Sequence, residues 1–367
     1  MSFTPPPYPY ERLDDLRALA ARHEGGAIDC SIGTPCDPPP PAVLEVLALA
    51  TGARGYPTSA GSLEYREAAA AWLARRFAVE VGVDGLAACV GTKEFVATLP
   101  GYLHLRAPER DTVLYPAISY PTYAMGAALA GLRAVAVPVI DGRLDLAAVS
   151  PDDVARALVF WANSPSNPTG ALDDLEGITA WGRHRGVLVA SDECYAEFTW
   201  AGRPRSILEH GLAGVLSVHS ISKRSNLAGL RAGFYAGDPE VVTFLRSVRQ
   251  HAGFMVPGPV QAAVAQAYRD DEHVSAQRET YAARLQLLAG ALTSVGVAAP
   301  MPEGSFYLWC SKPGVDGWRL ARELAETAAL VVSPGDLYGE AGANHVRVAL
   351  VQPDDRVALA AARLRRR

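Results

Sequence analysis

Short apolar segments alternate with helical patterns from about residue 86 to residue 235 of this chain. The segments between the apolar runs carry apolar residues at helical spacing. Strands that alternate with helices are typical of a parallel sheet, because each helix returns the chain to the same edge. The sequence therefore predicts a mainly parallel α/β sheet, with strands at residues 112–115, 134–139, 157–161, 186–190, 215–219 and 229–236.

Polar side chains follow several of these predicted strands. Asn167, Asp192 and Lys223 each lie within a few residues of the end of one, and Tyr195 lies three residues beyond Asp192. Ligands of open parallel sheets bind at the carboxyl ends of the strands. We therefore expect these four side chains to share one binding site.

Lys223 ends the stretch SISK, residues 220–223, and Arg231 follows eight residues later. A lysine among hydroxyls and beside a guanidinium suits Schiff-base chemistry on a phosphorylated aldehyde, because the cation lowers the pKa of the amine and the hydroxyls hold the phosphate. Arg231 lies inside the predicted strand 229–236, where a partly buried cation needs an anion. The alternative for Lys223 taken alone is a solvated surface lysine.

Length and charge exclude several classes of protein. At 367 residues the chain can bury a large core and form more than one domain. Its net charge of −5 argues against a nucleic-acid partner. No apolar run approaches the roughly 20 residues that span a bilayer, so we expect no membrane contact and a cytoplasmic location. The five cysteines have no paired short spacing and indicate neither a metal site nor a disulfide framework.

Two further regions flank the predicted sheet. The chain starts with a proline-rich segment and a predicted helix at residues 10–23. Beyond the sheet, long amphipathic helices precede short strands and a further helix from Trp318. The helices are predicted at 239–249, 260–269 and 272–294, and the strands at 305–310, 329–333 and 345–351. We expect an N-terminal arm (1–40) that joins the small domain, a large domain (41–284) and a small C-terminal α+β domain (285–367).

Together these motifs resemble the class I/II aminotransferases of fold type I, which depend on pyridoxal 5'-phosphate. The resemblance rests on the stretch NPTG (residues 167–170), on Asp192 with Tyr195 three residues later, and on SISK with Arg231. It extends from about residue 31 to residue 350. It implies a large domain with a mainly parallel seven-stranded sheet, a smaller α+β domain, pyridoxal 5'-phosphate as cofactor, and a homodimer.

The resemblance assigns three catalytic residues and their neighbours. Lys223 would carry the cofactor, Asp192 would keep its ring nitrogen protonated, and Tyr195 would donate to its phenolic oxygen. Asn167 would donate to the same oxygen, and Tyr120, held extended before a proline, would stack on the ring. Taken singly, Asp192 could instead be a helix cap and Tyr195 a core aromatic.

The cofactor phosphate is expected at the start of a helix. Gly91 and Thr92 open a helical pattern, so backbone amides and a hydroxyl could hold an anion there, although an ordinary helix cap is the alternative. In the resembling family the phosphate site would comprise Gly91, Thr92, Lys93, Ser220, Ser222 and Arg231, with Tyr56 from the neighbouring subunit.

Arg347 is the expected substrate anchor. It alternates with Val346 and Val348 and so faces away from them. It could be a surface cation of a strand. The resemblance implies instead that Arg347 clamps the α-carboxylate of the substrate, while Gly33 lets the backbone approach that group and Asn167 contacts it as well.

The implied reaction is the transfer of an amino group between glutamate and an oxo acid. Outside the cofactor motifs the chain looks most like the N-succinyldiaminopimelate aminotransferases of lysine and cell-wall biosynthesis, and Lys93, Arg224 and His251 are cations expected near the site. An aminotransferase of another amino acid or of a specialised metabolite stays open, as does a carbon–sulfur lyase with the same cofactor. A nicotinamide oxidoreductase is disfavoured, because no G-x-G-x-x-G turn opens the predicted sheet.

Overall fold

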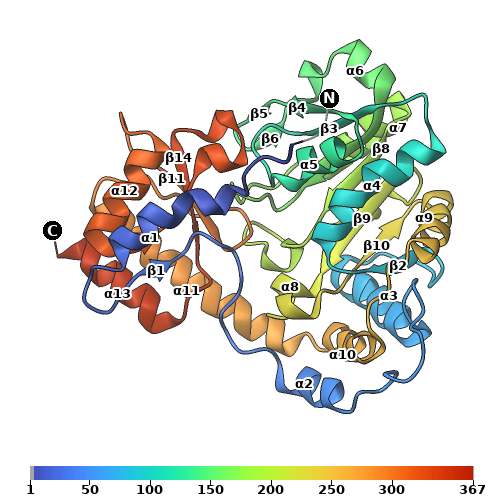
Figure 1. Ribbon diagram of the computed structural model, residues 1–367, viewed down its shortest axis with the longest axis horizontal. Coiled ribbons are helices and arrows are strands. Elements are labelled where there is room, and N and C mark those ends of the chain that lie inside the picture. Colours follow the sequence, from blue (N-terminus) through green and yellow to red (C-terminus); the bar gives the residue numbers. More distant parts are fainter. Residues whose placement is uncertain (1–3, 367) are drawn as a thin grey trace.

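The computed structural model describes residues 4–366 and has a seven-stranded sheet at the centre of its larger unit (Figure 1). The strands are β2 (Leu86–Cys89), β3 (Thr112–Pro116), β4 (Arg133–Val137), β7 (Ala157–Asn163), β8 (Leu188–Asp192), β9 (Val215–Ser220) and β10 (Gly233–Gly237). Their spatial order is β2-β10-β9-β8-β7-β3-β4. Only β10 runs antiparallel to its neighbours, so the prediction of a mainly parallel sheet is confirmed.

Helices cover both faces of this sheet. One face packs against α4 (Thr92–Arg106), α5 (Thr122–Leu129) and α9 (Pro239–His251). The other packs against α3 (Leu63–Phe77), α7 (Leu175–Arg185) and α10 (Gly258–Arg269). Every residue of β7 is buried, as the continuous apolar composition of a strand covered on both sides requires.

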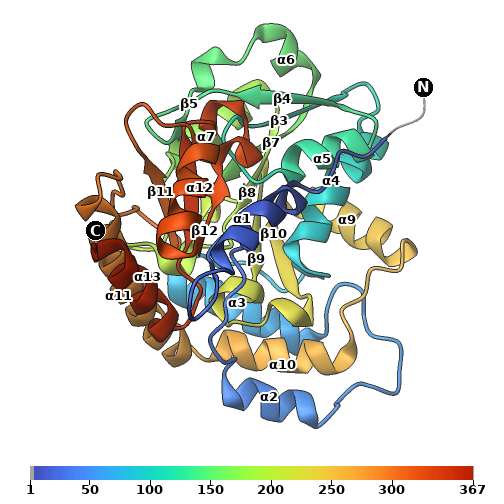
Figure 2. The same ribbon diagram turned by 60° about the vertical axis from the view of Figure 1, so that its left-hand side comes forward.

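Smaller elements complete the larger unit. The helix α2 (Pro41–Ala48) lies beside α10 in both ribbon views (Figures 1 and 2). The short helix α8 (Ile221–Arg224) directly follows β9. The remaining elements are β5 (Val139–Ile140), β6 (Arg143–Leu144), α6 (Pro151–Arg156) and the 3-10 helices η2 (Leu146–Ala148), η3 (Ala196–Phe198), η4 (Ile207–His210) and η5 (Ala228–Leu230).

The start and the end of the chain together form the smaller unit. The 3-10 helix η1 (Pro9–Leu13) leads into α1 (Asp14–Ala20), which packs on α12 (Gly317–Ala328), and β1 (Ile28–Asp29) pairs in parallel with β12 (Leu330–Val331). A second sheet has the antiparallel order β11-β14-β13. The remaining elements are β11 (Tyr307–Ser311), β13 (Ser333–Pro334), η6 (Gly335–Tyr338), η7 (Glu340–Gly342), β14 (His345–Ala349) and α13 (Asp354–Arg365).

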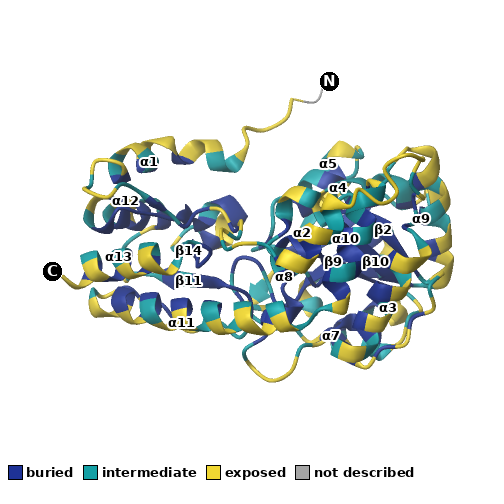
Figure 3. Cartoon of the chain, turned by 90° about the horizontal axis from the view of Figure 1, so that it is seen from below, coloured by how far each residue is buried: buried dark blue, intermediate teal, exposed yellow. Residues whose placement is uncertain are grey.

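One long helix, α11 (Glu272–Ser294), runs from the larger unit into the smaller one (Figure 3). Its second half packs into the core of the smaller unit through Leu285, Leu288 and Leu292. Its first two turns instead contact the segment that follows α8 in the larger unit. The helix therefore connects the two units without an intervening loop.

Several predicted strands are shifted, and two of these shifts have clear local causes. The strand predicted at residues 134–139 ends at Val137, because Pro138 has no N–H to donate to the ladder. The strand predicted at 186–190 is β8 and begins later, because Gly186 closes α7 in the left-handed region with φ 63°. Proline and glycine thus set these boundaries.

Within residues 4–366 no helix is both long and apolar enough to cross a bilayer. The same part of the chain contains no cluster of three or more histidine, cysteine, aspartate or glutamate side chains that could hold a metal ion.

Candidate active site

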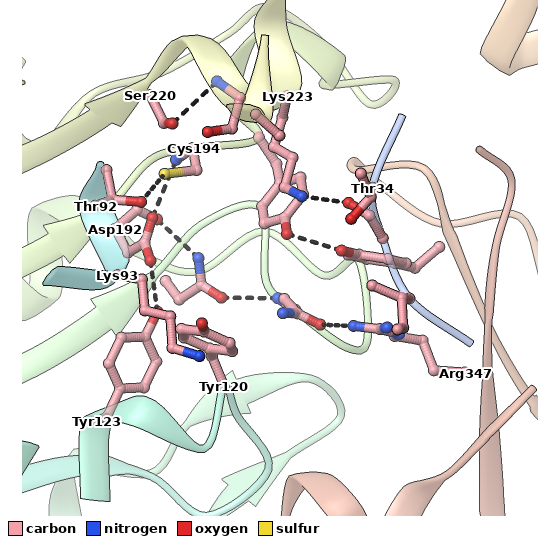
Figure 4. Close-up of a pocket in the computed structure, with 18 of the residues that line it drawn as sticks. Thr34, Thr92, Lys93, Tyr120, Tyr123, Asp192, Cys194, Ser220, Lys223 and Arg347 are labelled. Carbon is pink, nitrogen blue, oxygen red and sulfur yellow. Dashed lines mark hydrogen bonds between the residues drawn. The ribbon is translucent and has the colours of Figure 1, made fainter. Parts of the chain in front are cut away.

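A pocket lies where the carboxyl ends of β7, β8 and β9 face the smaller unit (Figure 4). Figure 4 shows Thr92, Asp192 and Ser220 on one side of it and Arg347 on the other. The predicted site residues that line it are Gly33, Thr92, Lys93, Tyr120, Asn167, Asp192, Tyr195, Ser220, Ser222, Lys223, Arg231 and Arg347. The fold therefore brings together residues that lie more than 300 positions apart in the sequence.

Lys223 projects into this pocket from α8. Its Nζ donates a hydrogen bond to the backbone oxygen of Gly33. Burial, together with the positive charges of Arg347 and Arg231, lowers the pKa of the Lys223 amine to about 8. An amine with this pKa is available as a nucleophile near neutral pH, because a sizeable fraction carries no proton.

Gly33 lies against the ring of Tyr307. A Cβ atom at position 33 would lie 2.1 Å from the Tyr307 hydroxyl oxygen and 2.9 Å from the ring carbon that bears it. Only glycine therefore lets the backbone come this close, and its carbonyl oxygen then reaches the Lys223 amine.

The residues predicted to hold phosphate meet at one end of the pocket. Gly91 caps α4 with φ 76°, and a Cβ atom there would lie 2.3 Å from Nη2 of Arg231. Thr92 begins α4, and the hydroxyl of Ser220 accepts a hydrogen bond of 3.1 Å from the backbone N–H of Ser222. A helix N-terminus beside hydroxyls and a guanidinium is an anion site.

Arg231 does not lie inside a strand, so that prediction is wrong. Residues Ala228–Leu230 form the turn η5, and Arg231 follows in the left-handed region with φ 51°, before β10 begins at Gly233. The side chain is exposed, and its Nη1 donates to the backbone oxygen of Ala228 at 2.9 Å. No carboxylate within residues 4–366 forms an ion pair with this guanidinium, which leaves it available to an anionic ligand.

Asp192 ends β8 as a buried carboxylate. Its Oδ2 accepts a hydrogen bond of 3.0 Å from the Tyr123 hydroxyl, and its Oδ1 accepts one of 3.2 Å from the backbone N–H of Cys194. Burial raises the pKa of Asp192 above its usual value. No arginine or lysine within residues 4–366 forms an ion pair with Asp192. A buried carboxylate without such a partner is costly unless a ligand supplies the cation.

Sequence reasoning assigned no role to Tyr123. It stands three residues after Tyr120 in the same motif. The motif could have drawn attention to Tyr123, but it gives no sign of the hydrogen bond to Asp192. Its ring stacks on Trp161 at 5.1 Å between centroids, which directs the hydroxyl to Asp192. Tyr123 therefore orients this carboxylate.

A chain of side-chain contacts links β7 to the smaller unit. Asn163 accepts a hydrogen bond of 2.7 Å from the backbone N–H of Asn167 and donates one of 2.7 Å to the backbone oxygen of Asp192. The side-chain oxygen of Asn167 in turn accepts one of 2.8 Å from Nη1 of Arg347. The loop after β7 is thereby fixed to both sides of the pocket.

Arg347 is a buried cation with no ion-pair partner among residues 4–366. Only 1% of its surface is exposed. Its Nη2 donates to the backbone oxygen of Ser31 at 2.6 Å, while its Nε has no hydrogen-bond partner. The rings of Tyr307 and Tyr338 lie 4.2 Å and 4.7 Å from the guanidinium carbon. Such a desolvated guanidinium is prepared for a carboxylate ligand.

Two pairs of tyrosine hydroxyls lie at this site, and only Tyr195 among the four residues was predicted from the sequence. The hydroxyls of Tyr195 and Tyr307 lie 2.8 Å apart, and those of Tyr10 and Tyr338 lie 3.2 Å apart. Tyr8, from the arm, also lines the pocket. No local motif marks Tyr8, Tyr10, Tyr307 or Tyr338, and each hydroxyl pair joins segments more than 100 positions apart.

The three cations expected near the site have different environments. Lys93 lines the pocket, and its Nζ lies 3.4 Å from the Tyr8 hydroxyl. Arg224 is buried away from the pocket and forms ion pairs with carboxylates of the larger unit, so its expected availability is wrong. His251 is the last residue of α9 and does not line the pocket.

The chemical groups of the site fit pyridoxal 5'-phosphate. It offers a primary amine with a lowered pKa, an anion site at a helix start, and a buried carboxylate without a cationic partner. The guanidinium of Arg231 lies directly against Gly91, so a side chain at position 91 would have to displace it from this place.

The doubly covered sheet and the lysine site at its strand ends define a pyridoxal-phosphate-dependent enzyme of fold type I. Residues 26–364 match the model of the family "Aminotransferase class I and II", and the chain belongs to this family. The predicted family, fold type and cofactor are confirmed.

Similar proteins cover nearly the whole chain. It is 45% identical to the "Probable aminotransferase Rv1178" of Mycobacterium tuberculosis over 98% of this chain and 85% of that protein. It is 42% identical to the "4-dedimethylamino-4-oxo-anhydrotetracycline transaminase OxyQ" of Streptomyces rimosus over 98% of this chain and 99% of that protein.

Among solved structures, a "probable N-succinyldiaminopimelate aminotransferase" of Thermus thermophilus superposes with a TM-score of 0.87 at 32% identity, covering 97% of this chain and 99% of that one.

Proposed function

We propose that this aminotransferase moves an amino group between glutamate and an oxo acid, with Arg347 binding the α-carboxylate and Lys223 moving the α-proton. The observation that carries the proposal is the buried guanidinium of Arg347, which has no ion-pair partner among residues 4–366 and lies across the pocket from Asp192. The test is an assay that scores the oxo-acid and amine products of each candidate pair of substrates.

When bound, pyridoxal 5'-phosphate supplies an aldehyde that takes the amino group and a ring that accepts the electron pair left at the substrate Cα. Thr92, Ser220, Ser222 and Arg231 would hold its phosphate. Asp192 would pair with the protonated ring nitrogen. Gly91, Lys93, Tyr120, Asn167 and Tyr195 are the other residues that we assign to its binding.

Lys223 performs the proton transfer in this proposal. Its Nζ takes the proton from the substrate Cα, and the same ammonium then delivers a proton on the cofactor side, so one group serves as base and acid. The low pKa of the amine favours the first step. The hydrogen bond to Gly33 limits where Nζ can lie.

The variant Arg347→Lys is expected to raise the KM for glutamate by about 10- to 100-fold, because a point charge cannot reproduce a two-pronged clamp on a carboxylate. Binding of the cofactor should change little, since Arg347 is not among the residues assigned to the phosphate. The measurement is steady-state kinetics, with Arg322→Lys, an exposed residue of α12, as the matched control. An unchanged KM for glutamate would remove Arg347 from the substrate site.

For the acceptor we propose N-succinyl-2-amino-6-oxopimelate, with glutamate as donor. The sequence resemblance to that subfamily supports it, and so does the similar structure from Thermus thermophilus. Lys93 is the pocket-lining cation best able to meet a distal carboxylate, because it has no ion pair among residues 4–366, whereas Arg224 is already paired.

The acceptor proposal predicts that N-succinyldiaminopimelate has the highest kcat/KM among amino donors. Aspartate, alanine, phenylalanine and N-acetylornithine are the comparison set. If one of these exceeds it by tenfold or more, about 1.4 kcal/mol in the transition state, the acceptor proposal fails and the aminotransferase proposal stands. Lys93→Ala should lower kcat/KM for the succinylated substrate by a larger factor than kcat/KM for alanine, both measured with saturating cofactor.

A second acceptor class has one specific observation in its favour. Tyr8, Tyr10 and Tyr120 line the pocket, and aromatic surfaces of this kind suit a flat polycyclic ketone. The relative at 42% identity is named as a transaminase of an anhydrotetracycline. The same substrate screen, extended to polycyclic ketones, decides between the classes, and release of ammonia with an oxo acid would reveal a carbon–sulfur lyase.

We also propose a homodimer in which Tyr56 reaches the phosphate site of the partner subunit. Tyr56 is 99% exposed in the single chain, which is unusual for a large aromatic residue. Light scattering at assay concentration should give twice the chain mass of 38.9 kDa. Tyr56→Phe should weaken cofactor binding, while Tyr102→Phe should not. A monomer that is fully active would contradict the dimer.

A further inference from the structure

We propose that Arg224 is a positioning residue, which fixes the turn that carries Lys223 to the start of α11, the helix that leads to the smaller unit. The proposal rests on the proposed role of Lys223. Arg224 is the neighbour of Lys223 in α8, but its side chain points into the protein interior and is only 2% exposed. It is therefore neither a solvated residue nor a substrate-binding one.

Every donor of the Arg224 guanidinium is used. Nε donates to Glu197 at 3.2 Å, and Nη1 donates to the Ser225 hydroxyl at 3.3 Å and to the backbone oxygen of Ala267 at 2.5 Å. Nη2 donates to the backbone oxygen of Asp270 at 2.9 Å and to the Asp271 carboxylate at 2.8 Å. An arginine side chain has five N–H donors, so this set is complete.

The acceptors identify what Arg224 holds. Ala267 lies in the last turn of α10, and Asp270 and Asp271 form the junction between α10 and α11. A lysine at position 224 could keep the charge but could not bridge these groups, because it has three donors on a single nitrogen. The planar guanidinium of Arg224, with donors on three nitrogens, is therefore the group that joins α8 to this junction.

The two residues after Arg224 make contacts in the same direction. The Ser225 hydroxyl lies 2.9 Å from Nε2 of His273, and Asn226 donates to the side chain of Gln277 at 2.9 Å. Both partners lie near the start of α11. The three consecutive residues that follow Lys223 thus form hydrogen bonds with the start of α11.

Arg224 is also anchored from the opposite side. Glu197, its partner at Nε, accepts a hydrogen bond of 2.8 Å from Trp72 and forms an ion pair of 2.9 Å with Arg76. Both of these belong to α3. The guanidinium therefore has a fixed support in the larger unit, and a shift of α11 would be transmitted through it to the Lys223 turn.

This arrangement connects the two halves of the proposed reaction site. The second half of α11 belongs to the same apolar core as Val346 and Val348 of β14, the strand that carries Arg347. Arg224 thereby sets the place of the Lys223 amine relative to the helix that supports the substrate anchor. Misplacement of a reacting group by about 1 Å costs on the order of 100-fold in rate.

The test compares Arg224→Lys with Arg75→Lys in the cofactor-loaded enzyme. Arg75 is a matched control, because it also binds the α10–α11 junction, through the Tyr268 backbone oxygen at 2.7 Å and Asp271 at 3.2 Å, but has no contact with the Lys223 turn. Arg224→Lys should lower kcat by about 10- to 100-fold and leave the glutamate KM within about threefold. Arg75→Lys should leave both unchanged.

Two further readouts separate positioning from general destabilisation. Amide hydrogen exchange should accelerate in residues 221–227 and 270–277 together in Arg224→Lys, a result that does not depend on activity. The pH midpoint of the visible absorbance of the bound cofactor should move by about half a unit or more, about threefold in the underlying equilibrium.

Three outcomes would overturn the proposal: a wild-type kcat in Arg224→Lys, equal effects of Arg75→Lys, or exchange that accelerates in only one of the two segments. If Arg224→Lys does not fold, Ser225→Ala removes the contacts of the Ser225 hydroxyl with His273 and with Nη1 of Arg224, and it keeps the other hydrogen bonds of Arg224. It should accelerate exchange in both segments and lower kcat by about fivefold, on the order of what one hydrogen bond contributes. Wild-type exchange and kcat in Ser225→Ala would then refute the coupling. Failure of Lys223→Ala to lose activity would instead refute the proposed function itself, and the exchange readout would remain valid.

Discussion

The variant Lys223→Ala is expected to lose activity by on the order of 10⁵-fold or more, because the only group proposed to bind the aldehyde and to move the proton is removed. The fold should persist. The amine makes one hydrogen bond, to the Gly33 backbone oxygen, and its burial is costly in the folded protein, as the lowered pKa shows. Steady-state assays and thermal melting of the purified variant provide the two measurements.

The composition of the chain makes the control for this prediction unusually clean. The sequence has only three lysines, Lys93, Lys223 and Lys312. Lys312 is paired with Glu323 in the smaller unit, so Lys312→Ala should retain wild-type activity. Borohydride reduction and peptide mapping should find the cofactor on Lys223 alone. Full turnover by Lys223→Ala would remove this residue from the centre of the mechanism.

Asp192→Asn is expected to lower kcat by about 10³-fold, in the range that removal of one proton-controlling group costs. The ring nitrogen would lose the carboxylate that keeps it protonated, while the phosphate site and Lys223 would stay intact. Cofactor content should therefore fall much less than kcat. Single-turnover rates with glutamate, combined with the absorbance of bound cofactor, measure the two effects separately.

Asp173→Asn is the matched control for that variant. Asp173 is also a carboxylate removed from water, and burial raises its pKa, but it accepts its hydrogen bonds from the backbone of Leu144 and Asp174. It should leave the single-turnover rate unchanged. Equal rates for Asp192→Asn and the wild type would contradict the proposed pairing of Asp192 with the ring.

The parts of the site that could be predicted from sequence are those carried by short motifs at strand ends. Asn167 and Lys223 follow β7 and β9 by a few residues, and Asp192 is the last residue of β8. The parallel order of these strands places their ends side by side. The shared pocket follows from this order, because each polar residue is tied to a strand end by a few positions of chain.

The turn at Arg231 was not predictable in the same way. The apolar and glycine residues around it match a strand pattern, and the pattern does not record that Arg231 adopts a left-handed conformation. Its partner Gly91 is 140 positions away, and the close approach between them is a property of tertiary structure only. A residue-by-residue pattern carries no information on such a contact.

The environment of Arg224 was also outside the reach of sequence reasoning. From the sequence, a charged residue next to the proposed catalytic lysine is expected to be available to substrate. In the fold, the Arg224 side chain instead points towards Glu197 and Asp271. Tyr307 and Tyr338 have no motif at all, and their roles arise only when β14 brings Arg347 between them. Both cases depend on which way a side chain faces, which packing decides.

The central claim is that this site transfers an amino group by a two-step exchange, and it is tested most directly by mixing the loaded enzyme with glutamate in the absence of an acceptor. The account predicts the release of one equivalent of 2-oxoglutarate per bound cofactor, no release of ammonia, and a return to the starting absorbance when an oxo acid is added. Release of ammonia, or no 2-oxoglutarate from an enzyme that holds its cofactor on Lys223, would contradict it.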